Sequence, residues 1–274
     1  MLAAAIRKSA PADWTLLLYD LPSFDLTDRV QVFQLQGLKP DVIINCAACT
    51  NVDGCEEQEN LAMQVNGYGP GLLAELARQI DAVLMHISTD FVFDGRKTSP
   101  YVEGDPTNPL SVYGKSKLLG EQQILKSGLQ KYFIVRTSWL YGQHGNNFVE
   151  TIIRLAKERT DLKIISDQKG TPTLTDDLAE AVFTLLQTNA YGIYHYSNEG
   201  QCSWFEFASE IVTLARKRFS LKIEQVLPIP TEGYPLPAVR PKYSVFSKQK
   251  IKLAAGINIP DWRDSLAFYL AQRK

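Results

Sequence analysis

Apolar segments of strand length alternate, along the first half of the chain, with segments whose apolar residues recur at helical spacing. Buried strands are predicted at residues 14–20, 41–48, 82–88 and 131–138, and helices at 26–38, 58–79 and 111–128. The first of these helices is expected to be capped by Thr27 and to end at Gly37. The strands are continuously apolar, which is typical of a parallel sheet covered on both faces. The pattern therefore predicts an α/β, Rossmann-like doubly wound fold, with ligands beyond the carboxyl ends of the strands.

The pattern loosens from about residue 139 onward. Helices are predicted at 146–159, 176–188 and 203–218, and a short strand at 192–197. The proline-rich segment 226–244 is incompatible with a regular helix or a central strand, so we expect a loop that lines a cleft. We therefore expect a dinucleotide-binding domain over residues 1–138 and a smaller, mixed substrate-binding lobe over 139–274, with some chain crossover between them.

Composition narrows the partners and the compartment. The formal net charge of −1 gives no electrostatic reason to expect nucleic acid or an anionic membrane surface as a partner. No apolar run approaches the ~20 residues that a membrane-spanning helix needs. Four cysteines do not make a disulfide scaffold in a chain of 274 residues, and a cytoplasmic location is expected. The spacing of Cys46, Cys49 and Cys55 has no later partner pair, so we expect no metal site.

Candidate chemistry lies in two short segments in the middle of the chain. Tyr113 and Lys117 stand four residues apart on a predicted helix, so their side chains share one face. A cation near a phenol is expected to lower its pKa and make it a usable acid or base. Ser88 and Thr89 end a predicted buried strand, where a hydroxyl could bind and orient a substrate carbonyl. An exposed Tyr/Lys pair and a simple turn are the alternatives for these residues taken singly, but their order along the chain favours an active site.

Several blocks of sequence resemble one family. "STDFVFDG", "VYGKSKLLGE", "VRTSWLYG", "GNNF", "DQKGTPT" and "RPKYS" are similar to those of dTDP-4-dehydrorhamnose reductases, which are extended short-chain dehydrogenase/reductases. The resemblance runs from about residue 14 to the C-terminus. It implies an NADPH- or NADH-dependent oxidoreductase that reduces the C4 keto group of dTDP-4-dehydro-L-rhamnose to dTDP-L-rhamnose, a precursor of cell-surface polysaccharide. Its partner would be a small nucleotide sugar, and a homodimer is left open.

The resemblance also implies a set of site residues. The catalytic set would be Thr89, Tyr113 and Lys117. Cofactor contacts would come from Asp20, Asp25, Leu26, Thr27, Cys46, Ala47, Ala48, Ser88, Tyr113 and Lys117. Substrate contacts would come from Thr50, Val52, Thr89, Trp139, Asn147 and Arg240. Core packing is an alternative for Trp139, and a surface ion pair is an alternative for Arg240. A carboxylate at position 20 repels a 2′-phosphate, which favours NADH.

Two residues depart from the family pattern: Cys49 stands where the family usually has His, and Phe91 where it usually has Tyr. Neither belongs to the expected catalytic set. Related dehydratases use an Asp-Glu pair after the strand-end Thr, whereas this chain has Asp90 and Phe91, which favours reduction. The alternatives are another nucleotide-sugar reductase or epimerase, or a non-catalytic binding protein of the same fold, like the beta subunit of methionine adenosyltransferase.

Residues 1–20 contain no glycine, although the family places a turn of the form G-x-x-G-x-L-G near its N-terminus. Met1 and Leu2 align with the end of that turn, and Ala3 lies where its last glycine is expected. The resemblance therefore implies that a central first strand and most of the phosphate loop, roughly ten residues, are lacking from this chain. Activity of these 274 residues is accordingly a separate expectation from the function of the family.

Overall fold

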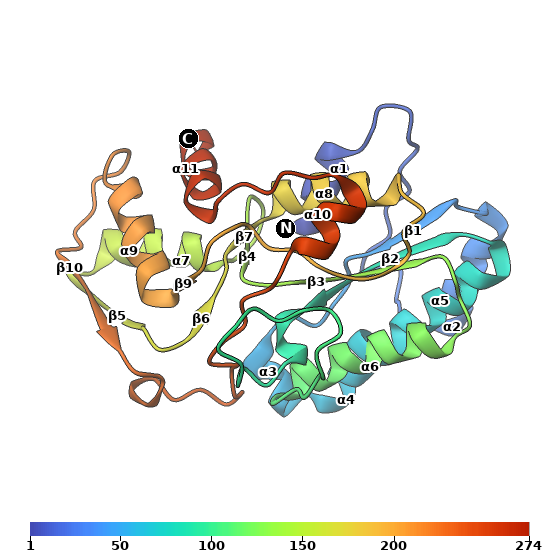
Figure 1. Cartoon of the computed structure of the whole chain (residues 1–274), viewed down its shortest axis with the longest axis horizontal. Coiled ribbons are helices and arrows are strands. Elements are labelled where there is room, and N and C mark those ends of the chain that lie inside the picture. The colour runs from blue at the N-terminus through green and yellow to red at the C-terminus, as the bar shows by residue number, and fades with distance from the viewer. Residues whose placement is uncertain (274) are drawn as a thin grey trace.

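A parallel sheet forms the centre of the computed structural model, which describes residues 1–273 (Figure 1). Its four strands, in spatial order, are β1 (Val42–Asn45), β2 (Val83–Thr89), β3 (Tyr132–Thr137) and β8 (Gly192–His195). Every neighbouring pair is parallel. The predicted α/β fold with a parallel sheet is confirmed, and three of its four strands arise from the continuously apolar segments of the first half of the chain.

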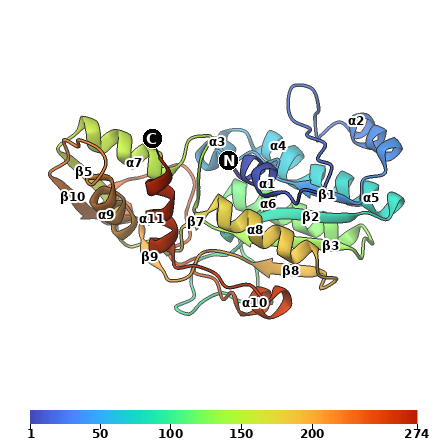
Figure 2. The ribbon, with the colours of Figure 1, turned by 90° about the horizontal axis from the view of Figure 1, so that it is seen from above.

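Helices cover both faces of this sheet (Figure 2). One layer contains α2 (Arg29–Gln34), α5 (Gly69–Ile80) and α6 (Val112–Lys126); the other contains α1 (Leu2–Ser9), α8 (Thr175–Leu186) and α10 (Gln249–Ala255). The alternation of side chains along β2 explains the two layers. Leu84 packs into the core with α5 and α6, whereas Met85 and Ile87 pack into the core with α1 and α8.

A second core lies beyond the carboxyl ends of the strands. It is formed by α7 (Phe148–Glu158), α9 (Trp204–Ala215), α11 (Trp262–Gln272) and the parallel pair β5 (Asp161–Ile165) and β10 (Gln225–Ile229). Two further two-residue pairs complete it: β4 (Leu140–Tyr141) with β7 (Thr173–Leu174), and β6 (Lys169–Gly170) with β9 (Cys202–Ser203). Because α8, β8 and α10 follow residue 139 yet pack with the sheet, the chain passes between the two parts more than once (Figure 1).

The helical segment after β1 is not the single helix predicted at 58–79. It consists of α3 (Val52–Glu57), α4 (Glu59–Ala62), the π-helical turn η2 (Met63–Tyr68) and α5. Gly120 of α6 lies so close to this turn that an added Cβ would stand 2.3 Å from the Asn66 carbonyl oxygen. Glycine therefore allows α6 to approach the turn at van der Waals distance.

The prediction of a strand at 14–20 is wrong. The segment is irregular, and Leu17, Leu18 and Tyr19 are exposed. The segment has strand-like composition, but among residues 1–273 no strand edge pairs with it, and a strand needs a hydrogen-bonded neighbour. The free edge of β1 is likewise unpaired within the described residues.

Two boundaries also differ from prediction. Asp28, rather than Thr27, caps α2, because its carboxylate accepts hydrogen bonds from the amides of Val30 and Gln31. The helix continues as the 3₁₀ turn η1 (Leu35–Leu38) past Gly37. In the proline-rich segment, β10 occupies its first residues in a two-stranded sheet, and the rest is loop around the 3₁₀ turn η4 (Thr231–Gly233). In the part of the chain that the structure describes, no helix has the length and apolar character to cross a membrane.

Candidate active site

The carboxyl end of β2 and the first turn of α6 are brought together by two local features. Ser111 caps α6, since its hydroxyl oxygen accepts a hydrogen bond from the amide of Gly114 at 3.1 Å. An added Cβ at Gly114 would stand 2.3 Å from the carbonyl oxygen of Phe91, so only glycine permits this approach. As a result the strand-end hydroxyl of Thr89 lies within hydrogen-bonding reach of Tyr113.

Lys117 follows one helical turn after Tyr113 and is almost fully buried, with 2% of its surface exposed. Its Nζ donates a hydrogen bond to the carbonyl oxygen of Ile87 at 2.6 Å and lies 3.4 Å from Nε2 of His86. No carboxylate of residues 1–273 forms an ion pair with it. Burial lowers the pKa of this amine to about 8, although the carboxylate of Glu121 acts in the opposite direction.

The pKa of Tyr113 is raised, not lowered as the spacing of Tyr113 and Lys117 predicted. Burial of the phenol is the main cause, and the negative charge of Asp90 adds to it. The hydrogen bond with Thr89 lowers this pKa, and Lys117 does not contribute because its amine is directed at the backbone of β2. Tyr113 is therefore a neutral phenol at physiological pH, which suits a proton donor.

Asp90 also belongs to this site. The sequence analysis considered it only in comparison with the Asp-Glu pair of related dehydratases. Its side chain is buried, and its Oδ1 accepts a hydrogen bond from the Thr89 hydroxyl at 3.1 Å. Its other oxygen, Oδ2, has no hydrogen-bond partner among the described residues. Burial raises the pKa of Asp90 to about 6, while the neighbouring hydroxyl groups of Ser244 and Thr89 lower it. Its position directly after the strand-end Thr89 is the sequence feature that could have indicated a role in the site.

The loop after β1 carries several of the expected cofactor and substrate contacts. The amide of Ala47 donates to Oδ1 of Asn45 at 3.0 Å, which shapes the turn at Cys46, Ala47 and Ala48. Asn66, from the π-helical turn, accepts from the amide of Cys49 at 2.8 Å and donates to its carbonyl oxygen at 3.0 Å. The π-helical turn therefore holds this loop in place. Thr50 is exposed and Val52 half-buried at the start of α3.

Trp139 follows β3 with a positive φ of 48°, an unusual conformation for a bulky residue. Its indole packs on Gly170, where an added Cβ would stand 2.6 Å from the ring, and stacks on Trp204 with ring centroids 3.5 Å apart. Packing from two sides holds the residue in this conformation. Both core packing and a substrate contact remain compatible with its half-buried side chain.

Arg240 joins the proline-rich loop to α3. Its guanidinium forms two hydrogen bonds with Asp53, at 3.0 and 2.7 Å, and donates to the carbonyl oxygen of Ala238 at 2.9 Å. A cavity of about 940 Å³ adjoins it, between segment 94–98 and segment 231–243. Thr89, Tyr113 and Lys117 do not line this cavity, so the cavity and the cluster of these three side chains are separate features.

The remaining expected site residues make local contacts. Asp20 is exposed in an irregular segment, Asp25 accepts hydrogen bonds from Thr27, and Leu26 is buried in the core with α5. Asn147 caps α7, accepting from the amide of Glu150 and donating to the carbonyl oxygen of Gly142. Within residues 1–273, no hydrogen bond joins these side chains to the Thr89–Tyr113–Lys117 cluster.

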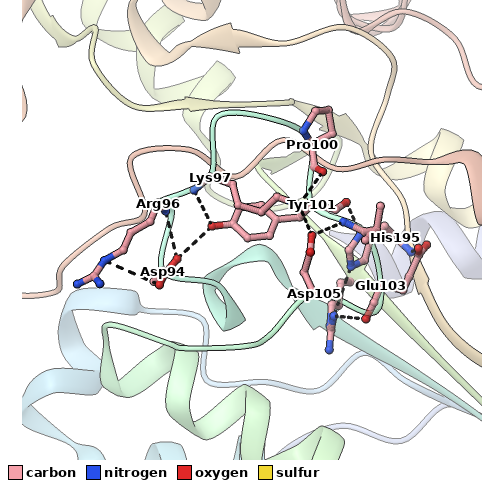
Figure 3. A network of polar contacts seen from close by, with 10 residues as sticks. Asp94, Arg96, Lys97, Pro100, Tyr101, Glu103, Asp105 and His195 are labelled. Atoms are coloured by element: carbon pink, nitrogen blue, oxygen red, sulfur yellow. Dashed lines mark hydrogen bonds and ion pairs between the residues drawn. The ribbon is translucent and has the colours of Figure 1, made fainter.

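A polar network, which sequence analysis did not predict, fixes the loop between β2 and α6 (Figure 3). The Tyr101 hydroxyl donates to Asp94 at 3.1 Å, and the amide of His195 on β8 donates to Glu103 at 3.0 Å. Burial, together with the charge of Arg136, lowers the pKa of His195 to about 3, so this ring is neutral. The described residues contain no group of three His, Cys, Asp or Glu side chains that could hold a metal ion.

The parallel sheet, the strand-end threonine and the Tyr-x-x-x-Lys helix together define the architecture of an extended short-chain dehydrogenase/reductase. Over residues 1–274 the chain matches the family model described as "RmlD substrate binding domain". The chain belongs to this family.

Known relatives agree with this membership. The chain is 44% identical over 268 residues to the spore coat polysaccharide biosynthesis protein SpsK of Bacillus subtilis, covering 97% of this chain and 92% of the relative. It is similar to the crystal structure of a dTDP-4-dehydrorhamnose reductase from Clostridium acetobutylicum, with a TM-score of 0.94, 43% identity and coverage of 98% and 95%. The same enzyme from Bacillus anthracis, in complex with NADP, gives a TM-score of 0.94, 39% identity and coverage of 99% and 95%.

Proposed function

We propose that the chain reduces the C4 keto group of dTDP-4-dehydro-L-rhamnose to dTDP-L-rhamnose, with NADPH as the source of hydride. The observation that carries the proposal is the convergence of Thr89, Tyr113 and Lys117 at the carboxyl end of β2. The substrate is that of the relatives named dTDP-4-dehydrorhamnose reductase, and the Bacillus anthracis enzyme is described in complex with NADP.

The residues at the carboxyl ends of β1 and β2 fit a nicotinamide cofactor. Lys117 has three donors and uses one on Ile87, so its buried amine can hold ribose hydroxyls. Ala47 and Ala48, which follow β1, are small enough for backbone to approach the cofactor, and Ser88 lies near the carboxyl end of the neighbouring strand β2. We assign cofactor binding to residues 1–138 and substrate binding mainly to 139–274. When bound, the reduced nicotinamide supplies the hydride.

The protein's own groups supply position and one proton. The Thr89 hydroxyl turns its proton from Oδ1 of Asp90 to the keto oxygen and so orients C4. Tyr113, kept neutral by burial, gives its proton to the same oxygen as charge develops there. Lys117 fixes the ribose and, through Ile87, keeps α6 in register with β2. Reduction needs no further acid or base, which agrees with the single carboxylate, Asp90, after Thr89.

The nucleotide portion of the substrate is assigned to the cavity beside Arg240. A guanidinium matches the oxygens of a diphosphate in a forked geometry, and Arg240 lines the cavity from the proline-rich loop. Trp139, which follows β3, does not line this cavity, and its proposed contact is with another part of the substrate. A cytoplasmic location is proposed as well, since all four cysteines are free thiols.

Tyr113→Phe tests the proposal. The variant keeps the ring packed against Phe91, whose centroid lies 5.3 Å away, but removes the proton donor. We expect kcat for oxidation of NADPH in the presence of the keto sugar to fall about 10²- to 10⁴-fold, with KM nearly unchanged. Tyr191→Phe is the matched control, because that hydroxyl bonds only to exposed Asn189. A parent chain that is folded and binds NADPH but never oxidises it would favour the non-catalytic binding protein.

A further inference from the structure

Glu121 belongs to the face of α6 that carries Tyr113 and Lys117. The three residues are spaced four apart, so their side chains follow one another along the helix. Glu121 has only 1% of its surface exposed. A carboxylate so deeply buried is costly unless it is paired and hydrogen-bonded.

The partners of Glu121 lie at the ends of the two central strands. Its Oε1 accepts a hydrogen bond from the hydroxyl of Ser88 and one from Nε of Arg136 at 3.0 Å. Its Oε2 accepts from Nη2 of Arg136 at 2.7 Å. Ser88 and Arg136 are direct neighbours in the register of β2 and β3. One carboxylate therefore links α6, β2 and β3 next to Thr89.

Glu121 also acts on the charge of Lys117, because the other titratable groups near this amine are neutral. His86 of β2, whose buried ring has a pKa well below its usual value, faces the amine without charge. Cys46, after β1, has its pKa raised to about 12 by burial and is a neutral thiol at physiological pH. Glu121, whose carboxylate forms an ion pair with Arg136, therefore acts on Lys117 in favour of its charged form. Behind Glu121, Arg136 faces the neutral ring of His195 and the carbonyl oxygen of Glu103.

We propose that Glu121 is a positioning residue of the active site: paired with Arg136, it holds the Ser88 hydroxyl at the end of β2 and places a carboxylate one helical turn from Lys117. The inference rests on the proposed function for its consequence in catalysis, because a cationic Lys117 binds ribose hydroxyls more strongly than a neutral amine. The effect of Glu121 on the charge of Lys117 involves only side chains of this protein, so it can be tested without cofactor or substrate. Arg136 forms an ion pair with Glu121 and orients its carboxylate.

The test measures Lys117 directly. The chain is labelled with ¹³C at lysine Cε, the Lys117 signal is assigned by its loss in Lys117→Met, and its titration is followed by NMR. In Glu121→Gln we expect the midpoint of Lys117 to fall by about one pH unit or more, the usual effect of a nearby opposite charge. An unchanged midpoint overturns the proposal.

Two further variants guard against a folding defect. Glu121→Gln/Arg136→Met removes both charges and leaves no unpaired buried arginine, so it is expected to fold and to show a smaller fall in the Lys117 midpoint, because losing the Arg136 cation partly offsets losing the Glu121 anion. Glu150 of α7 is the carboxylate partner of Arg273, so Glu150→Gln removes a different acidic partner of an arginine. This variant is expected to leave the titration midpoint of Lys117 unchanged. An equal fall in Glu150→Gln, or no fall in the double variant, contradicts a specific role for Glu121.

A kinetic readout separates this inference from the proposed function. Glu121→Asp keeps the charge but shortens the reach to Ser88, so Lys117 should titrate as in the parent while kcat/KM for the keto sugar falls. Glu121→Gln should lower kcat/KM. It should also shift the alkaline limb of the pH profile of kcat/KM to lower pH. If no variant or parent turns over the sugar, the proposed function fails while the Lys117 titration still decides the role of Glu121.

Discussion

The side-chain nitrogen of Lys117 and the carbonyl oxygen of Ile87 are joined by a hydrogen bond of 2.6 Å in the interior of the protein. This bond attaches the helix that carries Tyr113 to the strand that ends in Thr89. The position is favourable for orienting α6 but unfavourable for the charge, since burial lowers the pKa of the amine from 10.5 to about 8. The site therefore keeps a cation where folding alone would prefer a neutral group.

Lys117→Met should be more stable than the parent at neutral pH. Folding disfavours the ammonium, so the penalty is fully present below pH 8 and disappears as pH rises to 10.5, where the unfolded chain also loses the proton. The quantity to measure is the free energy of unfolding of Lys117→Met minus that of the parent, obtained by urea denaturation. We expect this difference to be about 3 kcal/mol larger at pH 7 than above pH 10.5. Lys115→Met, an exposed lysine on the same helix, should show no such pH dependence. A pH-independent difference for both variants would contradict the explanation.

Asp90→Asn should stabilise the protein in the opposite pH range. Burial raises the pKa of this carboxyl from 3.8 to about 6, so the penalty is absent below pH 3.8 and complete above about pH 6. Asparagine keeps an oxygen that accepts from Thr89. We expect the variant to gain about 3 kcal/mol in the free energy of unfolding at pH 7 relative to pH 4. Asp41→Asn is an exposed control, and a matching gain there would count against the burial of Asp90 as the cause.

Arg240→Lys and Asp53→Asn distinguish a diphosphate contact from a structural ion pair. The pair is partly exposed, so either change should cost less than about 1 kcal/mol in stability. If Arg240 grips a diphosphate, lysine loses the forked geometry and KM for the nucleotide sugar rises about tenfold, whereas Asp53→Asn frees the guanidinium and does not raise KM. Equal increases in KM for the two variants would mean that only the ion pair matters. Steady-state kinetics at fixed NADPH decide between these outcomes.

Gly120→Ala should destabilise the contact between α6 and the π-helical turn. The added Cβ would meet the Asn66 carbonyl oxygen at 2.3 Å, and backbone cannot move aside as a flexible side chain can. We expect a loss of about 1–3 kcal/mol in the free energy of unfolding. Gly37→Ala has nothing within 4 Å of the added Cβ and should change stability by less than about 0.5 kcal/mol. Similar losses in both variants would show that the close contact with Asn66 is not the cause, because alanine favours a helix over glycine and helix propensity alone would stabilise both variants.

Sequence predicted the sheet well where a strand could be recognised from its own residues. β1, β2 and β3 lie within the apolar segments 41–48, 82–88 and 131–138, apart from one residue at the end of β2, because strands buried on both faces are continuously apolar. Residues 14–20 have the same composition but no neighbouring edge, and pairing is not visible in composition. β4, β6, β7 and β9 are two residues each, too short for any periodicity.

At the candidate site, the sequence predicted those residues that can be recognised from their local spacing. Tyr113 and Lys117 share a helix face, and Thr89 ends a strand, so both features are local. Glu121 and Asp90 were missed as functional groups because their effect depends on burial, which is set by elements distant in the chain. The Arg240–Asp53 pair spans 187 residues and could not be inferred from either segment alone.

The stack of Trp139 on Trp204 joins the end of β3 to the first residue of α9, and the two indole planes are inclined by only 10°. Two chromophores held face to face at this distance couple their electronic transitions, which produces a paired circular-dichroism band and quenched emission. Separating β3 from α9 must break the stack and abolish both signals. The indole pair is therefore an intrinsic optical probe of the contact between the end of β3 and α9, and its loss on unfolding is expected to be measurable without an attached dye.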